Sequence, residues 1–140
     1  TYFIKKILPY GLKWVKLYSN LGGKIILNFE FGLFKWLCYI KQAFVIYTSI
    51  KSKKELLDFK IDGILIGDLI YDSYLRYRSK PTLDIKDFFL FRLIISSLFI
   101  FDKSKKYFSA NSPDALYTSY TAYLHHGIPV RFALSKGIVV

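Results

Sequence analysis

Methionine is absent from this 140-residue chain, and cysteine occurs once. With Cys38 as the only cysteine, no internal disulfide can form, and a metal site built on several thiolates is excluded. A lone thiol within an apolar stretch is typical of a small core residue, so we expect Cys38 to be buried. Because the chain starts at Thr1, lacks methionine and ends on the apolar run 138–140, we expect it to be a piece of a larger protein.

Arginine is also scarce. Four of the 21 basic residues are arginines, and the rest of the net charge of +11 comes from lysine. Base readout and phosphate clamping in nucleic-acid complexes depend on bidentate arginine. The lysine excess, together with abundant Ile, Phe and Tyr, is instead typical of an AT-rich coding sequence. The charge therefore does not indicate a nucleic-acid partner, although it is concentrated in residues 1–60 (net +8, against +3 for 61–140).

No apolar run is long enough for a membrane span, which needs about 20 mostly apolar residues. The longest candidate, Phe88–Phe101, is interrupted by Arg92 and bounded by Asp87 and Asp102. Together with the single thiol, which suits a reducing compartment, this pattern predicts a cytoplasmic protein.

Helical spacing of apolar residues dominates the first three quarters of the chain, and we expect helices over most of residues 1–106. The length of the apolar stretch 31–50 favours a largely buried helix. A turn at Asp62-Gly63 precedes a helix over 67–78. A further helix, capped by Asp84 or Asp87, is expected to run through Phe101.

The last quarter of the chain predicts an alternation of strand and helix. Residues 115–119 form a short β-type run, Pro129 suits the first position of a helix over 128–136, and Gly137 suits its end. A strand at 138–140 would complete a parallel β-α-β unit. The expected fold class is therefore α/β: a helical, basic and aromatic-rich segment 1–60 leading into a Rossmann-like domain, 61–140, truncated at its C-terminus.

One candidate site lies in the helix expected over 67–78. Asp68, Asp72 and Arg76 are spaced four residues apart and therefore share one helix face, beside Tyr71 and Tyr74. Carboxylates accept hydrogen bonds from sugar hydroxyls, aromatic rings cover apolar sugar faces, and a carboxylate can deprotonate an acceptor hydroxyl. The alternative is an ordinary Asp72–Arg76 ion pair with Asp68 as a helix cap.

A second candidate site is the segment 119–133, which leads into the start of the last expected helix. Free N–H groups there can bind an anion, and Arg131 would reinforce them. In the alternative interpretation this segment is a loop in which Gly127 and Pro129 only set the geometry. Adjacent side chains diverge, so His125-His126 is weak evidence for a metal site, and we expect none.

Several motifs of cofactor and metal chemistry are missing. The chain contains no G-x-G-x-x-G, no P-loop and no G-x-S-x-G. It also lacks an Asp-x-Asp pair, which argues against a metal-dependent nucleotide-sugar enzyme. We therefore expect no cofactor.

Residues 63–76, followed by the Ser119 to Gly137 segment, resemble bacterial capsule and surface-polysaccharide biosynthesis proteins, which look like metal-independent glycosyltransferases of the GT-B kind. The resemblance covers about residues 60–140 and implies the N-terminal, acceptor-side domain of such an enzyme. The family motifs fall on nine residues: Gly67, Asp68, Tyr71, Asp72, Arg76, Ser119, Tyr123, Gly127 and Arg131.

The resemblance implies transfer of a sugar from a nucleotide-sugar to a lipid-linked or other surface glycan. We expect Asp68 and Asp72 as the catalytic residues and the other seven as substrate-binding residues. The nucleotide-sugar donor is expected to bind mainly to a C-terminal domain beyond this sequence. Two alternatives stay open: a polyol-phosphate transferase of related architecture, and a non-enzymatic basic module that docks on membrane or RNA.

The first segment has the composition of an interfacial membrane segment. Its lysines alternate with aromatic residues that could enter the surface of the inner membrane: Lys5, Lys6, Lys13, Lys16 and Lys24, with Phe3, Trp14 and Tyr18. Peripheral attachment to that membrane is one expectation. The other is that the lysines form a solvated face and the aromatic residues belong to a core.

Overall fold

The computed structural model describes residues 16, 17, 19, 20 and 32–140. It divides the chain into two compact units, Thr1–Glu30 and Phe31–Val140. Of the lysines expected at the membrane, only Lys16 is among the described residues, so that prediction lies outside them. The second unit starts thirty residues before the expected domain boundary, because helices before residue 61 pack against helices after it.

The second unit is mainly helical, with a single two-stranded antiparallel hairpin among its described residues. In the hairpin Lys60 lies opposite Leu65 and Ile61 opposite Ile64. The elements, in chain order, are α2 (Leu33–Ser49), α3 (Lys53–Leu57), β1 (Lys60–Ile61), β2 (Ile64–Leu65), α4 (Gly67–Arg78), α5 (Phe88–Ala110) and α6 (Tyr123–Ser135).

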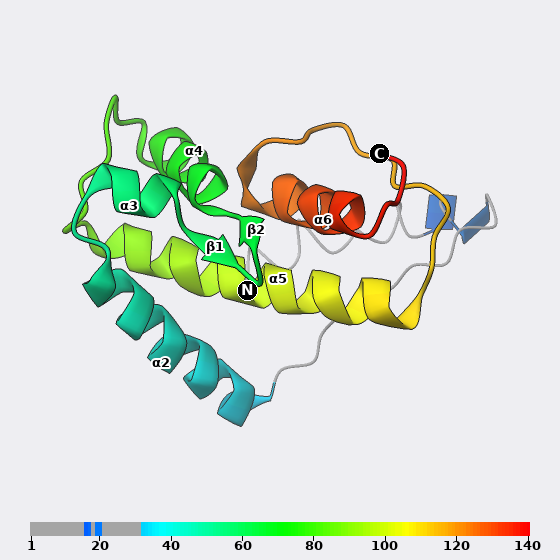
Figure 1. Ribbon diagram of the computed structural model, residues 1–140, viewed down its shortest axis with the longest axis horizontal. Coiled ribbons are helices and arrows are strands. Elements are labelled where there is room, and N and C mark those ends of the chain that lie inside the picture. Colours follow the sequence, from blue (N-terminus) through cyan, green and yellow to red (C-terminus); the bar gives the residue numbers. More distant parts are fainter. Residues whose placement is uncertain (1–15, 18, 21–31) are drawn as a thin grey trace. The chain divides into compact units, whose positions relative to one another are not determined.

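Helix α5 is the centre of this unit. Figure 1 shows α2 on one side of it and α4 and α6 on the other. The consecutive residues Leu93, Ile94 and Ile95 are all buried, so α5 is covered on more than one face. Its contact with α6 is aromatic: the Phe132 ring lies 5.6 Å from Phe101 and 5.7 Å from Phe108, centroid to centroid.

Helix α2 packs on α5 through one narrow side. Only Tyr39 and Ala43 are buried within it. The Tyr39 hydroxyl donates to Asp102 Oδ2 at 2.7 Å, and Lys35 Nζ lies 2.7 Å from the same oxygen. Burial, reinforced by the hydrogen bond to Asp102, raises the pKa of Tyr39 to about 12.

Two expectations for α2 were wrong. The helix exists where the sequence predicts it, but most of its apolar side chains are exposed rather than buried. Cys38 is exposed as well. Hydrophobicity on all sides of a helix predicts burial on all sides, yet α5 covers only one side of α2.

Local sequence patterns set most element ends as expected. Ser52 caps α3 by accepting the Glu55 N–H at 3.1 Å. The Asp62-Gly63 pair makes the two-residue hairpin turn, with φ of 50° and 80° that suit this dipeptide. Gly137, at φ 74°, ends α6 by adopting the left-handed conformation.

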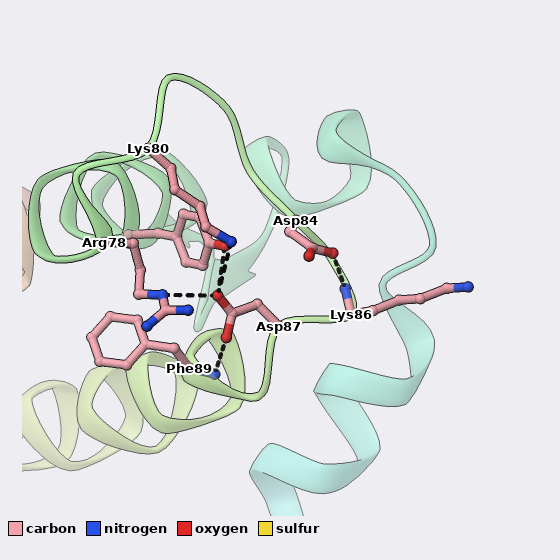
Figure 2. A network of polar contacts seen from close by, with 7 residues as sticks. Arg78, Lys80, Asp84, Lys86, Asp87 and Phe89 are labelled. Atoms are coloured by element: carbon pink, nitrogen blue, oxygen red, sulfur yellow. Dashed lines mark hydrogen bonds and ion pairs between the residues drawn. The ribbon is translucent and has the colours of Figure 1, made fainter.

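Asp87 caps the start of α5 and joins it to α4 (Figure 2). Its Oδ1 accepts the Phe89 N–H at 2.9 Å. Its Oδ2 accepts the Tyr74 hydroxyl at 2.8 Å and Arg78 Nε at 2.9 Å. The sequence predicted a cap at Asp84 or Asp87, and the structure assigns it to Asp87. The helix continues nine residues past the expected end at Phe101, to Ala110.

The Rossmann-like β-α-β unit predicted for the C-terminal quarter is wrong. Between residues 111 and 140 the structure contains one isolated parallel bridge, Ala115 to Val139, with a hydrogen bond of 2.8 Å from Leu116 N–H to the Val139 carbonyl. Parallel sheets are stable when both faces are covered. Here Tyr117 is 94% exposed and Thr118 and Ser119 are exposed, so this stretch lacks the cover that a parallel strand needs.

Helix α6 starts at Tyr123, five residues before the expected start. Pro129 therefore lies inside the helix rather than at its first position, and it cannot donate to the His125 carbonyl. The helix forms nevertheless, because its buried side chains Leu124, Ile128 and Phe132 pack against α4 and α5. Tertiary packing outweighs the local preference at this proline.

The Asp87 contacts should make stability depend on pH. The Phe89 N–H, followed by the Tyr74 hydroxyl and the Arg78 charge, lowers the pKa of Asp87 to about 2. A carboxyl with a lowered pKa contributes stability above its unfolded-state pKa, about 3.8. That contribution is lost as the pH falls from about 4 toward 2. In thermal unfolding, Asp87→Asn should lower Tm at pH 7 by several degrees and flatten the Tm–pH curve between pH 4 and 2.

The matched control is Asp84→Asn. Asp84 lies three residues earlier and accepts the Lys86 N–H at 3.0 Å in the loop before α5. The Asp84→Asn variant should keep the wild-type Tm at pH 7 and the steep fall of Tm between pH 4 and 2. An equal effect of the two substitutions would contradict the special role of Asp87.

Candidate functional site

The first candidate segment starts where α4 leaves the hairpin. The N–H groups of Ile66 and Gly67 both donate to the Phe59 carbonyl, at 2.9 and 3.0 Å. Gly67 is buried against α3, and a Cβ added to it would overlap the Leu56 carbonyl oxygen. Only glycine fits there, so Gly67 positions α4 by close backbone packing.

The second candidate segment packs on the first. A Cβ on Gly127 of α6 would lie 2.5 and 2.8 Å from the two methyl carbons of Leu69 of α4. The Leu124 N–H donates to the buried Ser73 hydroxyl at 3.1 Å, which holds the first turn of α6 against α4. The sequence assigned Gly67 and Gly127 to substrate binding, but the structure gives both a packing role.

Asp68 and Arg131 join the same two helices through an ion pair. Arg131 Nη1 and Nη2 each donate to one carboxylate oxygen of Asp68 at 2.5 Å, and Nη1 also donates to the Leu65 carbonyl at 2.6 Å. Partial burial disfavours the charged form of Asp68, but the hydrogen bonds and charge of Arg131 outweigh it and lower the pKa. A paired carboxylate with a lowered pKa is a poor general base.

Arg76 and Tyr123 meet at the solvent-facing edge of this helix pair. The Arg76 guanidinium carbon lies 4.6 Å from the centre of the Tyr123 ring. Interaction with the Tyr123 phenol also raises the pKa of Arg76 above its ordinary value, so the guanidinium stays charged. The two candidate segments, 67–78 and 119–133, therefore meet here as well as at Asp68.

Two adjoining surface hollows share Arg76 and Tyr123. One, of about 430 Å³, is lined by Asp72, Leu75, Arg76, Ala122 and Tyr123. The other, of about 300 Å³, is lined by Arg76, Tyr77, Tyr120, Tyr123, His125 and His126. We call the two together the α4–α6 groove.

The groove contains one carboxylate, a guanidinium, two imidazoles and three phenols. Tyr120 and His126 form an edge-to-face ring pair at 5.8 Å. Six groove residues are not among the nine predicted site residues: Leu75, Tyr77, Tyr120, Ala122, His125 and His126. Leu75 and Tyr77 flank Arg76 in the sequence, and the other four lie within the candidate segment 119–133, so proximity to predicted residues was the signal that could have found them.

The remaining predicted site residues lie elsewhere. Tyr71 is half-buried, and Lys53 Nζ lies 4.4 Å from the centre of its ring. Ser119 is exposed in the loop before α6 and does not line either hollow. Of the nine predicted residues, three line the groove: Asp72, Arg76 and Tyr123.

Within the described part of the chain, no group of three His, Cys, Asp or Glu side chains is arranged to hold a metal ion. No helix among the described residues has both the length and the apolar character needed to cross a bilayer.

Comparisons with known proteins give no relative of this chain. No protein-family model matches, and neither the curated proteins nor the solved structures contain a significant match. The comparisons therefore add nothing to the functional argument, which depends on the chemistry of the groove and on the resemblance of residues 63–76 and of the Ser119 to Gly137 segment.

The packing role of Gly67 can be tested directly. Gly67→Ala places a methyl group against the Leu56 backbone, which cannot move aside as a side chain could, and we expect a loss of about 3 kcal/mol or more of unfolding free energy. Urea unfolding measures it. The control is Gly63→Ala, where the added methyl group enters open space but the backbone has a positive φ. It should lower the unfolding free energy by only about 1 kcal/mol.

The Asp68–Arg131 ion pair should stabilise the fold by joining α4 to α6. In a double-mutant cycle of Asp68→Asn and Arg131→Gln, we expect a coupling free energy of about 1–2 kcal/mol in urea unfolding. The same cycle on Asp72 and Arg76 should give a coupling below about 0.5 kcal/mol, the usual value for exposed pairs on a helix. Equal coupling free energies in both cycles would contradict the assignment of a structural role to Asp68–Arg131 and of a ligand-binding role to Asp72 and Arg76.

Proposed function

We propose that this chain supplies the acceptor-binding part of a glycosyltransferase that builds a surface polysaccharide, and that the α4–α6 groove takes a phosphate-bearing sugar. One observation carries the proposal: Asp72, Arg76 and Tyr123 line one hollow, although Tyr123 is about fifty residues from the other two in sequence. The resemblance of residues 63–76 and of the Ser119 to Gly137 segment to surface-polysaccharide enzymes supports the same class.

Each group in the groove suits such a ligand. A guanidinium binds phosphate oxygens through two N–H donors, and the imidazoles of His125 and His126 add further donors at the same edge. The ring of Tyr123 can cover the apolar face of a sugar. Asp72 is exposed and lines the hollow, so its carboxylate can accept hydrogen bonds from sugar hydroxyls.

Asp72 is the better candidate for the catalytic base, because Asp68 is held by Arg131. In the proposed step the acceptor hydroxyl oxygen attacks the anomeric carbon of the donor sugar. Asp72 takes the hydroxyl proton, and the bond from that carbon to the nucleotide diphosphate breaks, so the diphosphate leaves with its electron pair. Asp68 then has a positioning role.

The proposal does not depend on a parallel sheet, since α4, α6 and the loop before α6 form the groove. The proposed reaction also implies where the protein works, because nucleotide-sugars and lipid-linked acceptors meet at the cytoplasmic side of the inner membrane. We therefore place the protein there, as a peripheral rather than a spanning protein.

A polyol-phosphate transferase is the second candidate. The clustering of Arg76 with His125 and His126 favours it, because an acceptor that already carries phosphodiesters would use all three groups. The two candidates differ in the ligand that the groove should prefer, a sugar phosphate or a glycerol phosphate.

Binding to the groove can be measured by NMR titration of the whole chain with N-acetylglucosamine 1-phosphate, glycerol 3-phosphate, N-acetylglucosamine and inorganic phosphate. We expect the sugar phosphate to bind most tightly and to shift the side-chain resonances of Arg76 and Tyr123. Arg76→Gln should weaken that binding at least about tenfold, because one charge-assisted contact contributes about 1.5–3 kcal/mol.

The matched control is Arg92→Gln. Arg92 is also an exposed arginine beside an aromatic ring, Phe89, but it lies on α5 and does not line the groove. It should leave affinity unchanged. Preference for glycerol 3-phosphate would favour the second candidate, and equal losses in both variants, or no shifts at Arg76 and Tyr123, would contradict the proposed site.

A further inference from the structure

Helix α2 presents a continuous apolar surface to solvent. With 3.6 residues per turn, the side of the helix opposite Tyr39 and Ala43 carries mainly large apolar side chains. Phe34 is 82% exposed and Leu33 79%. We call this surface the outer face of α2; it consists of Leu33, Phe34, Leu37, Cys38, Ile40, Lys41, Phe44 and Val45.

Such a face is unusual for a helix in water. Single exposed apolar residues need no explanation, but a contiguous set along three or more turns marks an interaction surface. The side that packs on α5 is already occupied through Tyr39, Ala43 and the Asp102 contacts. The outer face is therefore a second, separate surface of the same helix.

The charges on and beside the outer face restrict what can cover it. α2 contains no acidic residue, and Lys41 lies within the face. Among residues 51–55, which follow the helix, the exposed Lys51, Lys53 and Lys54 outnumber the one carboxylate, the exposed Glu55, whose Oε2 accepts the Lys51 N–H at 2.9 Å. A second copy of this face would bring Lys41 toward another basic, acid-free surface, which is unfavourable. An anionic partner complements both the apolar residues and the lysines.

We propose that the outer face of α2 docks on an anionic phospholipid surface. The helix lies in the plane of the interface, with Phe34, Leu37 and Phe44 at the boundary between head groups and acyl chains. The aliphatic stem of Lys41 follows the apolar surface while its ammonium reaches the phosphates. This inference concerns α2 rather than residues 1–24, and it stands independently of the proposed activity.

The single cysteine provides a reporter on this surface. Cys38 is exposed on the outer face, so an environment-sensitive fluorophore can be attached without further engineering. With vesicles of equal parts phosphatidylglycerol and phosphatidylcholine, its emission should shift to the blue. With phosphatidylcholine alone the shift should be much weaker. The same dye on Cys38→Ser/Lys60→Cys, which labels the exposed hairpin, should not respond.

Substitutions then separate the charge and apolar contributions in a vesicle flotation assay. Lys41→Glu changes the charge by two units and should weaken partitioning roughly 30-fold, at about 1 kcal/mol per charge. Phe34→Ser/Phe44→Ser should weaken it by at least about tenfold. The matched controls are Lys60→Glu and Tyr117→Ser, exposed residues of the hairpin and of the loop before α6.

Folding is monitored by circular dichroism, and the exposed positions of all these residues predict an unchanged Tm. Four outcomes overturn the proposal. They are equal partitioning of α2 and control variants, an unresponsive dye at Cys38, a concentration-dependent dimer that Phe34→Ser abolishes, and protection of Cys38 from a water-soluble maleimide before vesicles are added. The third would assign the face to a second copy, and the fourth to another part of this chain.

Discussion

Helix α5 carries buried apolar side chains on successive residues, so it must be covered on more than one side, and the arrangement of the second unit results from that requirement. α4 and α6 cover one side and α2 part of the other. Asp87 sets where this helix begins and joins it to α4 through Tyr74 and Arg78. α2 packs mainly on α5, and α5 is the element that α4 and α6 both contact in addition to each other.

The contact between α4 and α6 depends on a second constraint, close backbone approach. Gly67 lets α4 start against α3, and Gly127 lets α6 approach Leu69. The ion pair of Asp68 and Arg131 then holds the two helices in register. These packing residues leave Asp72, Arg76 and Tyr123 to line the groove. Motif residues thus divide between those that build the site and those that a ligand can reach.

The groove and the outer face of α2 are chemically different surfaces. The groove combines charge, imidazole and phenol groups within two hollows, which suits a small anionic and hydroxylated ligand. The outer face of α2 combines large apolar residues with lysine and no carboxylate, which suits an extended anionic interface. The proposed action on a lipid-linked acceptor would use both kinds of surface.

Local sequence determined much of the secondary structure. The apolar periodicity of 31–50 and 67–78, the Asp62-Gly63 turn and the stop at Gly137 depend on neighbouring residues alone, and the structure confirms them. The sequence narrowed the cap of α5 to Asp84 or Asp87, and the structure assigns it to Asp87. The four-residue spacing that places Asp72 and Arg76 on one face of α4 is equally local.

Tertiary structure decided the rest, because burial and strand pairing depend on residues far apart in sequence. Ala115–Ser119 has strand-like composition, but no covered sheet exists among the described residues for it to join. Pro129 suits a helix start, yet the packing of Leu124 and Ile128 extends α6 before it. The sequence left Asp68 either a catalytic residue or a helix cap, and assigned Arg131, 63 residues away, to substrate binding. Only their contact in the folded chain, which commits both charges to each other, distinguishes Asp68 from the open carboxylate of Asp72.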